Sequence, residues 1–177
     1  MKDCLLTIVM PSYNIQDYIL KGIESFQQVN PNHKEKFEVL IVNDGSTDDT
    51  EKVAKEVLGK DSLLNGRVIT KENGGHGSTI NRGIQEAKGK FFKVIDGDDW
   101  IIPAEFEKFL DALETTDVDM IITDFTEQHV YNDTAVRNDF IDKYEVGKTY
   151  TGIPDVRIPM HSVTYKTSIL SKNNIRL

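Results

Sequence analysis

Three aspartates follow a short apolar run in quick succession. Residues 91–95 are apolar except for one lysine, which predicts a buried strand, and Asp96, Asp98 and Asp99 come directly after it. Two carboxylates about 5 Å apart repel each other by roughly 3 kcal/mol at an effective dielectric near 20, but by under about 1 kcal/mol in bulk water. The cluster is therefore either a solvated turn or, in a cleft, a site for a hard divalent cation such as Mg²⁺ or Mn²⁺.

Polar and turn-forming residues also follow two earlier apolar runs, at residues 5–10 and 37–42. They are Pro11, Ser12, Tyr13 and Asn14 after the first run, and Asp44, Gly45 and Ser46 after the second. The first group fits a turn in which Asn14 caps the next helix, or a surface that contacts a nucleotide base. The second fits an Asx turn, or a carboxylate that accepts a hydrogen bond from the imide N–H of uracil.

A glycine-rich segment, residues 72–78, follows a third predicted strand at 67–71. It fits a flexible connection or a phosphate-binding loop, although it has neither the lysine of a P-loop nor G-x-G-x-x-G spacing. Asn73 and Gly74 lie in this segment, and Asn81 lies in the helix predicted over 79–88, which Gly89 is expected to end. His76 and His161 are interpreted as ordinary loop or edge residues.

Apolar residues at helical spacing separate these strands, and a helix with Pro103 in its first turn precedes a fifth strand at 118–125. The order βαβαβαβαβ predicts an α/β fold with a mostly parallel, Rossmann-like sheet and helices on both faces. In such sheets ligands bind beyond the carboxyl ends of the strands. Since four polar loops all follow strands, we expect them to meet at one edge.

The pattern weakens after residue 125. Residues 126–156 are polar, with 128–131 and 149–151 as candidate strands of an edge hairpin. Residues 157–165 are predicted to be extended and 166–172 to form one or two helical turns.

Composition narrows the function further. The chain has 177 residues and a formal net charge of −8, which argues against nucleic acid as a partner. Its single cysteine allows no intramolecular disulfide, as is usual in a reducing compartment. No stretch is apolar for the roughly 18 residues that a membrane span requires.

Four segments together resemble the inverting nucleotide-sugar glycosyltransferases of family two, which have the GT-A fold. They are Ile8-Val9-Met10-Pro11-Ser12-Tyr13-Asn14, Val42-Asn43-Asp44-Gly45-Ser46-Thr47-Asp48, Glu72-Asn73-Gly74-Gly75 and Asp96-Gly97-Asp98-Asp99-Trp100. Each segment is common alone, but the four in this order are specific. The resemblance covers Leu5 to about Thr123.

The resemblance implies transfer of a sugar from a UDP-sugar to a hydroxyl acceptor, a glycan or lipid-linked glycan, in polysaccharide or glycoconjugate synthesis. The implied nucleotide-binding residues are Pro11, Ser12, Tyr13, Asn14, Asp44, Gly45, Ser46, Asn73, Gly74, Asn81, Asp96 and Gly97. Asp96 and Asp98 match the Asp-x-Asp of the family, with Asp96 near the ribose and Asp98 on the Mn²⁺ or Mg²⁺ that bridges the diphosphate. Asp99 is an alternative metal ligand.

The sequence departs from the family pattern at three places. Asn43 replaces the commoner first aspartate of Asp-Asp-Gly-Ser. Thr79-Ile80-Asn81 stands where many members have Ala-Arg-Asn, so an arginine that contacts base or phosphate is missing. Residues 160–166 lie where relatives often have a segment containing Trp-Asn-Lys.

The resemblance also implies a carboxylate general base in an acidic motif after residues 166–177. The catalytic base is therefore expected beyond Leu177, although Asp124 and Glu127 are candidates inside the chain. We expect residues 1–177 to be a single GT-A domain, truncated at its C-terminus, with a nucleotide-binding half (1–125) and the start of an acceptor half (126–177). The full-length protein is expected to be cytoplasmic, either free or peripheral to the membrane.

Two alternative functions stay open. A sugar nucleotidyltransferase shares a similar sheet but requires a glycine-rich basic loop after the first strand, and residues 11–17 contain no basic side chain. A non-catalytic nucleotide-sugar-binding module is favoured if the gene beyond Leu177 encodes no acidic motif.

Overall fold

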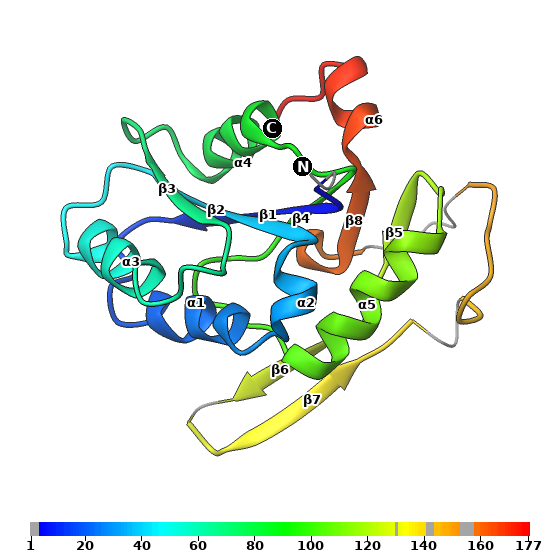
Figure 1. The fold of residues 1–177 in the computed structure, drawn as a ribbon, viewed down its shortest axis with the longest axis horizontal. Helices are drawn as coiled ribbons and strands as arrows, with labels where there is room; N and C mark the ends of the chain where they lie inside the picture. Colours follow the sequence, from blue (N-terminus) through cyan, green and yellow to red (C-terminus); the bar gives the residue numbers. More distant parts are fainter. Residues whose placement is uncertain (1–3, 130, 141–143, 153–157) are drawn as a thin grey trace.

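The computed structural model describes residues 4–129, 131–140, 144–152 and 158–177. Its main sheet has six strands in the order β3-β2-β1-β4-β8-β5 (Figure 1). The strands are β1 (Leu6–Ser12), β2 (Phe37–Asn43), β3 (Gly66–Thr70), β4 (Phe91–Val94), β5 (Met120–Ile122) and β8 (Val163–Lys166). Strands β1 to β4 run parallel, and β8 is antiparallel to both of its neighbours. The predicted α/β fold with a mostly parallel sheet is confirmed.

Helices cover both faces of this sheet (Figure 1). One face carries α1 (Ile19–Gln27), α2 (Pro31–Lys34), α3 (Thr50–Leu58) and α5 (Pro103–Thr115), and the other carries α4 (His76–Glu86) and α6 (Thr167–Lys172). Alternate residues of the central strands point to the two faces: Ile8 packs in the core of the first layer and Val9 in the core of the second. Every residue of β1, β2 and β4 is buried, which explains their nearly continuous apolar sequences.

Aromatic rings fill the larger core. Phe106 of α5 meets Phe37 of β2 with ring centroids 5.2 Å apart and Phe26 of α1 at 5.7 Å, both edge to face. Pro103 occupies the first turn of α5, as predicted, so this helix begins where its ring can reach the other two.

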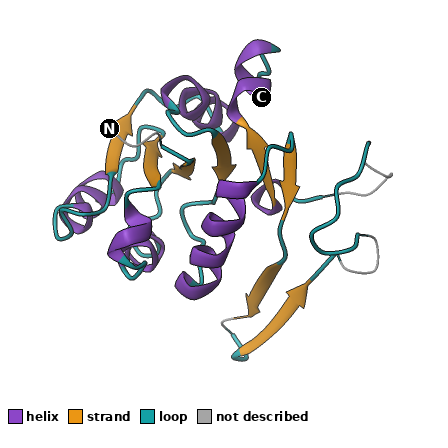
Figure 2. Cartoon of the chain, turned by 45° about the vertical axis from the view of Figure 1, so that its right-hand side comes forward, coloured by secondary structure: helices purple, strands orange, loops and turns teal. Residues whose placement is uncertain are grey.

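The C-terminal part of the sheet differs from the prediction. The fifth strand is limited to Met120–Ile122, and β8 lies between it and β4. Residues predicted as the end of that strand belong instead to a separate hairpin, β6 (Phe125–His129) and β7 (Thr134–Asn138) (Figure 2). Asp133 closes this hairpin with a φ of 52°, and the expected partner strand at 149–151 does not form. The hairpin pairs two polar strands that a short local turn joins, and it does not pair with the distant segment 149–151.

Other boundaries in this region are closer to expectation. The extended segment predicted at 157–165 contains a short 3₁₀ turn, Met160–Ser162, and the first residues of β8, while Arg157 lies outside the described residues. The helical turns predicted at 166–172 are α6.

Two helix-end predictions were wrong. Helix α1 begins at Ile19, and Asn14 has a left-handed φ of 50° four residues upstream of its N-cap, Tyr18. Helix α4 ends at Glu86, before Gly89, because Gly89 N–H donates to the buried Thr7 hydroxyl of β1 at 2.8 Å. In both cases a tertiary hydrogen bond fixes the backbone that the local sequence signal assigned to a cap.

Phe106→Ala is expected to lower the free energy of unfolding by about 3–5 kcal/mol, because it removes a buried ring with contacts on two other elements. Urea denaturation measures the change. Leu63→Ala is the control: its side chain is 59% exposed, and a surface change of this kind stays within about 0.5 kcal/mol. Equal effects of the two substitutions would contradict the assigned core.

Candidate functional site

The loop after β1 and the acidic loop after β4 are in direct contact, because these strands are neighbours in the sheet. Gly97 N–H donates to the Pro11 carbonyl at 3.1 Å. A Cβ at position 97 would lie 2.8 Å from both the Pro11 carbonyl and the Ser12 hydroxyl. Only glycine permits this approach, so Gly97 serves to bring the aspartates against the first loop.

Asn14 joins the loop after β1, called the first loop, to the loop after β2, called the second. Its backbone N–H donates to Ser46 Oγ at 3.0 Å, and its side-chain oxygen accepts from Thr47 N–H at 2.8 Å. The left-handed backbone of Asn14 orients both groups toward β2. Asn14 thus connects the loops after β1 and β2, and it does not cap the helix that follows.

Asp44 joins the second loop to the third, which is the glycine-rich loop after β3. Its carboxylate accepts from Lys71 Nζ at 2.6 Å, Gly74 N–H at 3.0 Å and Gly75 N–H at 2.8 Å. Burial alone raises the pKa of this carboxyl, but the hydrogen bonds from Lys71 and the two amides outweigh burial and hold the pKa below its usual value. Gly45, with φ 70°, turns the chain directly after it. Asp44 is therefore an ionised acceptor at the centre of the rim, the edge of the sheet where the loops after the parallel strands meet.

The acidic loop presents three carboxylates in different environments. Asp96 bonds His76 Nε2 at 2.8 Å, and its carbonyl accepts from Asp99 N–H at 2.9 Å, which closes a tight turn. Asp98 is exposed, whereas Asp99 is half-buried. Burial, followed by the charges of Asp98 and Asp96, raises the pKa of Asp99. The turn thus concentrates negative charge that its own contacts do not neutralise.

Helix α1 supports this loop from below. Ile101 N–H donates to Ser25 Oγ at 3.2 Å. A Cβ on Gly22 would lie 2.7 Å from the Asp99 carbonyl and 2.9 Å from Met10 Cε. The small residues of α1 thus set how closely the acidic loop approaches the sheet.

The 3₁₀ turn Met160–Ser162, directly before β8, adds a residue that sequence reasoning placed outside the site. Asp96, Asp99 and His161 each offer a ligand atom, and these atoms lie within 4.8 Å of one another. Asp98 is not in this group. The signal that would have identified His161 is the pairing of β8 with β4, which the chain order does not reveal.

The remaining predicted residues are spread along the rim. Asn73 and Gly74 lie in the third loop beside Asp44. Asn81, on α4, exchanges hydrogen bonds of 2.7 and 3.1 Å with the main chain of Leu177. Of the two candidate bases, Asp124 pairs with Arg137 at 2.7 Å, and Glu127 lies in the hairpin strand β6.

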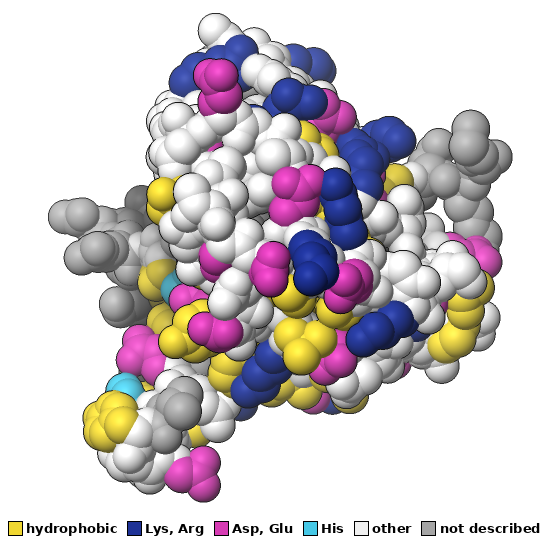
Figure 3. Space-filling model, turned by 90° about the vertical axis from the view of Figure 1, so that its left-hand side faces the viewer, with side chains coloured by type: hydrophobic (Ala, Val, Ile, Leu, Met, Phe, Trp, Pro, Cys, Tyr) yellow, Lys and Arg dark blue, Asp and Glu magenta, His cyan; other side chains and the backbone are white. Residues whose placement is uncertain are grey.

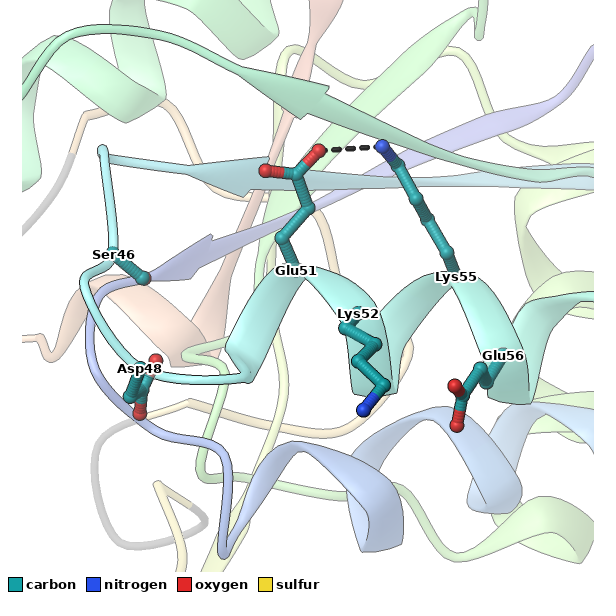
Figure 4. A pocket seen from close by; sticks show the side chains of 6 residues that line it. All are labelled: Ser46, Asp48, Glu51, Lys52, Lys55 and Glu56. Atoms are coloured by element: carbon teal, nitrogen blue, oxygen red, sulfur yellow. Dashed lines mark hydrogen bonds and ion pairs between the residues drawn. The ribbon is translucent and has the colours of Figure 1, made fainter.

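Figure 3 views the molecule from the side on which the parallel strands end, where acidic and basic side chains are interspersed. A shallow hollow of about 390 Å³ runs along α3 and is lined by Ser46, Asp48, Glu51, Lys52, Lys55 and Glu56 (Figure 4). Glu51 and Lys55 form an ion pair across part of it. The hollow shares Ser46 with the predicted site but none of the aspartates after β4, so we assign it no ligand.

The arrangement of strands and loops matches a known class of proteins. The family model described as glycosyl transferase family 2 matches residues 7–174. A crystal structure of S. aureus TarS 1–349 in complex with UDP-GlcNAc superposes with a TM-score of 0.71 at 21% identity, covering 97% of this chain and 48% of that one. The mannosyltransferase PcManGT from Pyrobaculum calidifontis, in complex with GDP-Man and Mn²⁺, gives a TM-score of 0.59 at 20% identity, over 66% and 34% of the two chains.

The chain therefore has the GT-A fold and belongs to glycosyl transferase family 2. Among curated proteins, the uncharacterized glycosyltransferase EpsJ of Bacillus subtilis (strain 168) is 31% identical over 124 residues, which are 70% of this chain and 35% of EpsJ. The chain spans less than half the length of the curated relatives it matches. In the described part of the chain, no helix has the length and apolar character needed to cross a membrane.

Gly22→Ala is expected to destabilise the protein by about 1–3 kcal/mol through overpacking against the acidic loop, although alanine is the better helix former. Thermal unfolding measures the cost. Gly59→Ala is the matched control, because a Cβ there would lie 3.3 Å from the Lys55 carbonyl and 3.6 Å from the Glu56 carbonyl. A Gly22→Ala protein as stable as the control would show that the loop does not depend on this contact.

Asp44→Asn is expected to cost about 1–3 kcal/mol at neutral pH, since it removes the charge from a buried, hydrogen-bonded group. The folded-state pKa of Asp44 is below its unfolded value. Its contribution is therefore complete above the unfolded pKa and is lost as the pH falls through the folded pKa. Urea unfolding at several pH values should show the gap between wild type and variant constant above about pH 5 and narrowing below about pH 4. A gap that widens in acid would contradict the assignment.

Proposed function

We propose that the four strand-end loops form the donor site of a UDP-sugar-dependent glycosyltransferase. The observation that carries the proposal is the state of Asp44. An ionised carboxylate has about four acceptor positions, and the described contacts use three of them. The remaining position is available to the imide N–H of uracil. Tyr13 follows Ser12, whose carbonyl accepts a hydrogen bond from Asp44 N–H, and it is 49% exposed, so its ring is free to stack on the base.

The diphosphate of the donor carries charge that the acidic loop cannot bind directly. We propose that Asp98, with Asp96 and Asp99, holds a Mn²⁺ or Mg²⁺ ion between protein and diphosphate. The donor set fits such an ion, since all three side chains supply carboxylate oxygen. When bound, the ion supplies Lewis-acid stabilisation of the charge that develops on the departing UDP. TarS with UDP-GlcNAc and PcManGT with Mn²⁺ support the proposal by analogy of fold.

The proposed reaction is a direct, inverting displacement. The acceptor hydroxyl oxygen bonds to the anomeric carbon of the sugar while the bond from that carbon to the β-phosphate oxygen of UDP breaks. The hydroxyl proton passes to a general base, which we do not assign within this chain. Residues 1–125 bind the nucleotide and residues 126–177 begin the acceptor half, within a single domain. The acceptor is a glycan or a lipid-linked glycan, in polysaccharide or glycoconjugate synthesis.

Isothermal titration calorimetry with UDP tests the site. The wild type is expected to bind UDP with Mn²⁺ present and much more weakly without it, because the ion offsets repulsion between diphosphate and acidic loop. Asp98→Ala is expected to abolish the dependence on Mn²⁺. Glu56→Ala, an exposed acid on α3 outside the acidic loop, should behave as the wild type. Metal-independent binding that survives Asp98→Ala would overturn the metal assignment.

A further inference from the structure

The turn that leads into β8 brings a histidine from late in the chain to the acidic loop. Because β8 is antiparallel to β4, Phe91 pairs with Lys166 and Lys93 with Thr164. The strand β8 therefore begins beside the end of β4, and His161 lies in the 3₁₀ turn Met160–Ser162 directly before it. A ring nitrogen of His161 lies within 4.8 Å of carboxylate oxygens of both Asp96 and Asp99.

The position of His161 is fixed by its surroundings. The edge of its ring meets Phe125 with centroids 4.6 Å apart and an interplanar angle of 71°. Its carbonyl accepts a hydrogen bond of 2.6 Å from Lys93 Nζ, and the next carbonyl, of Ser162, accepts from Thr123 N–H at 2.8 Å. Contacts from both neighbouring strand regions thus hold the imidazole beside the carboxylates, which is the pre-organisation that a ligand requires.

One nitrogen of the His161 ring lacks a hydrogen-bond partner among the described residues. This atom is the buried Nε2. Buried polar atoms are nearly always paired, so an unpaired one beside two carboxylates needs an explanation. His76, the other histidine at the acidic loop, differs because it already bonds Asp96 at 2.8 Å.

We propose that His161 is a further protein ligand of the divalent metal ion, together with Asp96 and Asp99. This inference rests on the metal site given under the proposed function and deepens it. Mg²⁺ takes oxygen ligands almost exclusively, whereas imidazole suits transition metals better. A donor set that adds this imidazole to the carboxylates of the acidic loop therefore selects Mn²⁺ over Mg²⁺.

Pulsed EPR of bound Mn²⁺ tests the ligand directly. With Mn²⁺ and UDP, the wild type should show the ¹⁴N coupling of a coordinated imidazole. The chain has only four histidines, so each can be tested. His161→Gln should lose the coupling, while His33→Gln, His76→Gln and the hairpin variant His129→Gln should keep it. Incorporation of ¹⁵N-histidine into the wild type should remove the ¹⁴N signal, which gives an answer even where a substitution prevents folding.

Metal affinities provide a second readout. His161→Gln should weaken Mn²⁺ binding at least about 10-fold, since loss of even an outer contact to a ligand commonly costs that much. Mg²⁺ binding should change less. His161→Asp should restore metal binding with a lower preference for Mn²⁺, because it supplies oxygen again.

The outcomes separate this inference from the proposed function. Mn²⁺ that binds with UDP but shows no ¹⁴N coupling, or a coupling that survives His161→Gln, would overturn the role of His161 and leave the donor site intact. If Mn²⁺ binds neither with nor without UDP, the proposed metal site and the role of His161 both fail.

Discussion

Repulsion among the three carboxylates after β4 is the constraint to which the rest of the rim responds. Elsewhere the protein pairs its buried acids with cations: Asp44 has Lys71, and Glu38 has Arg67. In the described part of the chain, no lysine or arginine forms an ion pair with Asp96, Asp98 or Asp99. The nearby Lys21 lies over the Trp100 ring at 3.2 Å. Burial, followed by the unbalanced charges of Asp98 and Asp96, raises the pKa of Asp99, and the same charges favour a cation at this turn.

Close backbone packing keeps this unfavourable turn in place. Gly97 allows the turn to approach the first loop, and Gly22 allows it to approach α1. Asn14 and Asp44 then connect the first loop to the second and the second to the third. Because Asn14 and the buried Asp44 each hydrogen-bond to the backbone of the neighbouring loop, the loops form one unit, and a ligand bound to any of them contacts a largely preformed surface.

Local sequence was sufficient for most of the fold of residues 5–122. Continuous apolar runs identify β1, β2 and β4 because these strands are buried on both faces, and a parallel sheet brings their following loops to one edge. Local sequence was insufficient where a partner is distant. The pairing of Phe91 with Lys166 depends on residues far apart in the chain. For that reason the insertion of β8, the shortened β5 and the position of His161 could not be predicted.

The antiparallel direction of β8 gives this late strand its importance. A parallel strand in the same place would begin at the edge of the sheet opposite the loops, and residues before it would lie away from the aspartates. An antiparallel strand begins where its parallel neighbours end, so the residues just before Val163 reach the acidic loop without a crossover helix. The segment from Met160 onward is thus part of the rim. Buried Lys93, whose pKa burial lowers to about 8, anchors it through the His161 carbonyl. Changes in this later segment therefore act on the same edge of the sheet as the loops that follow the parallel strands.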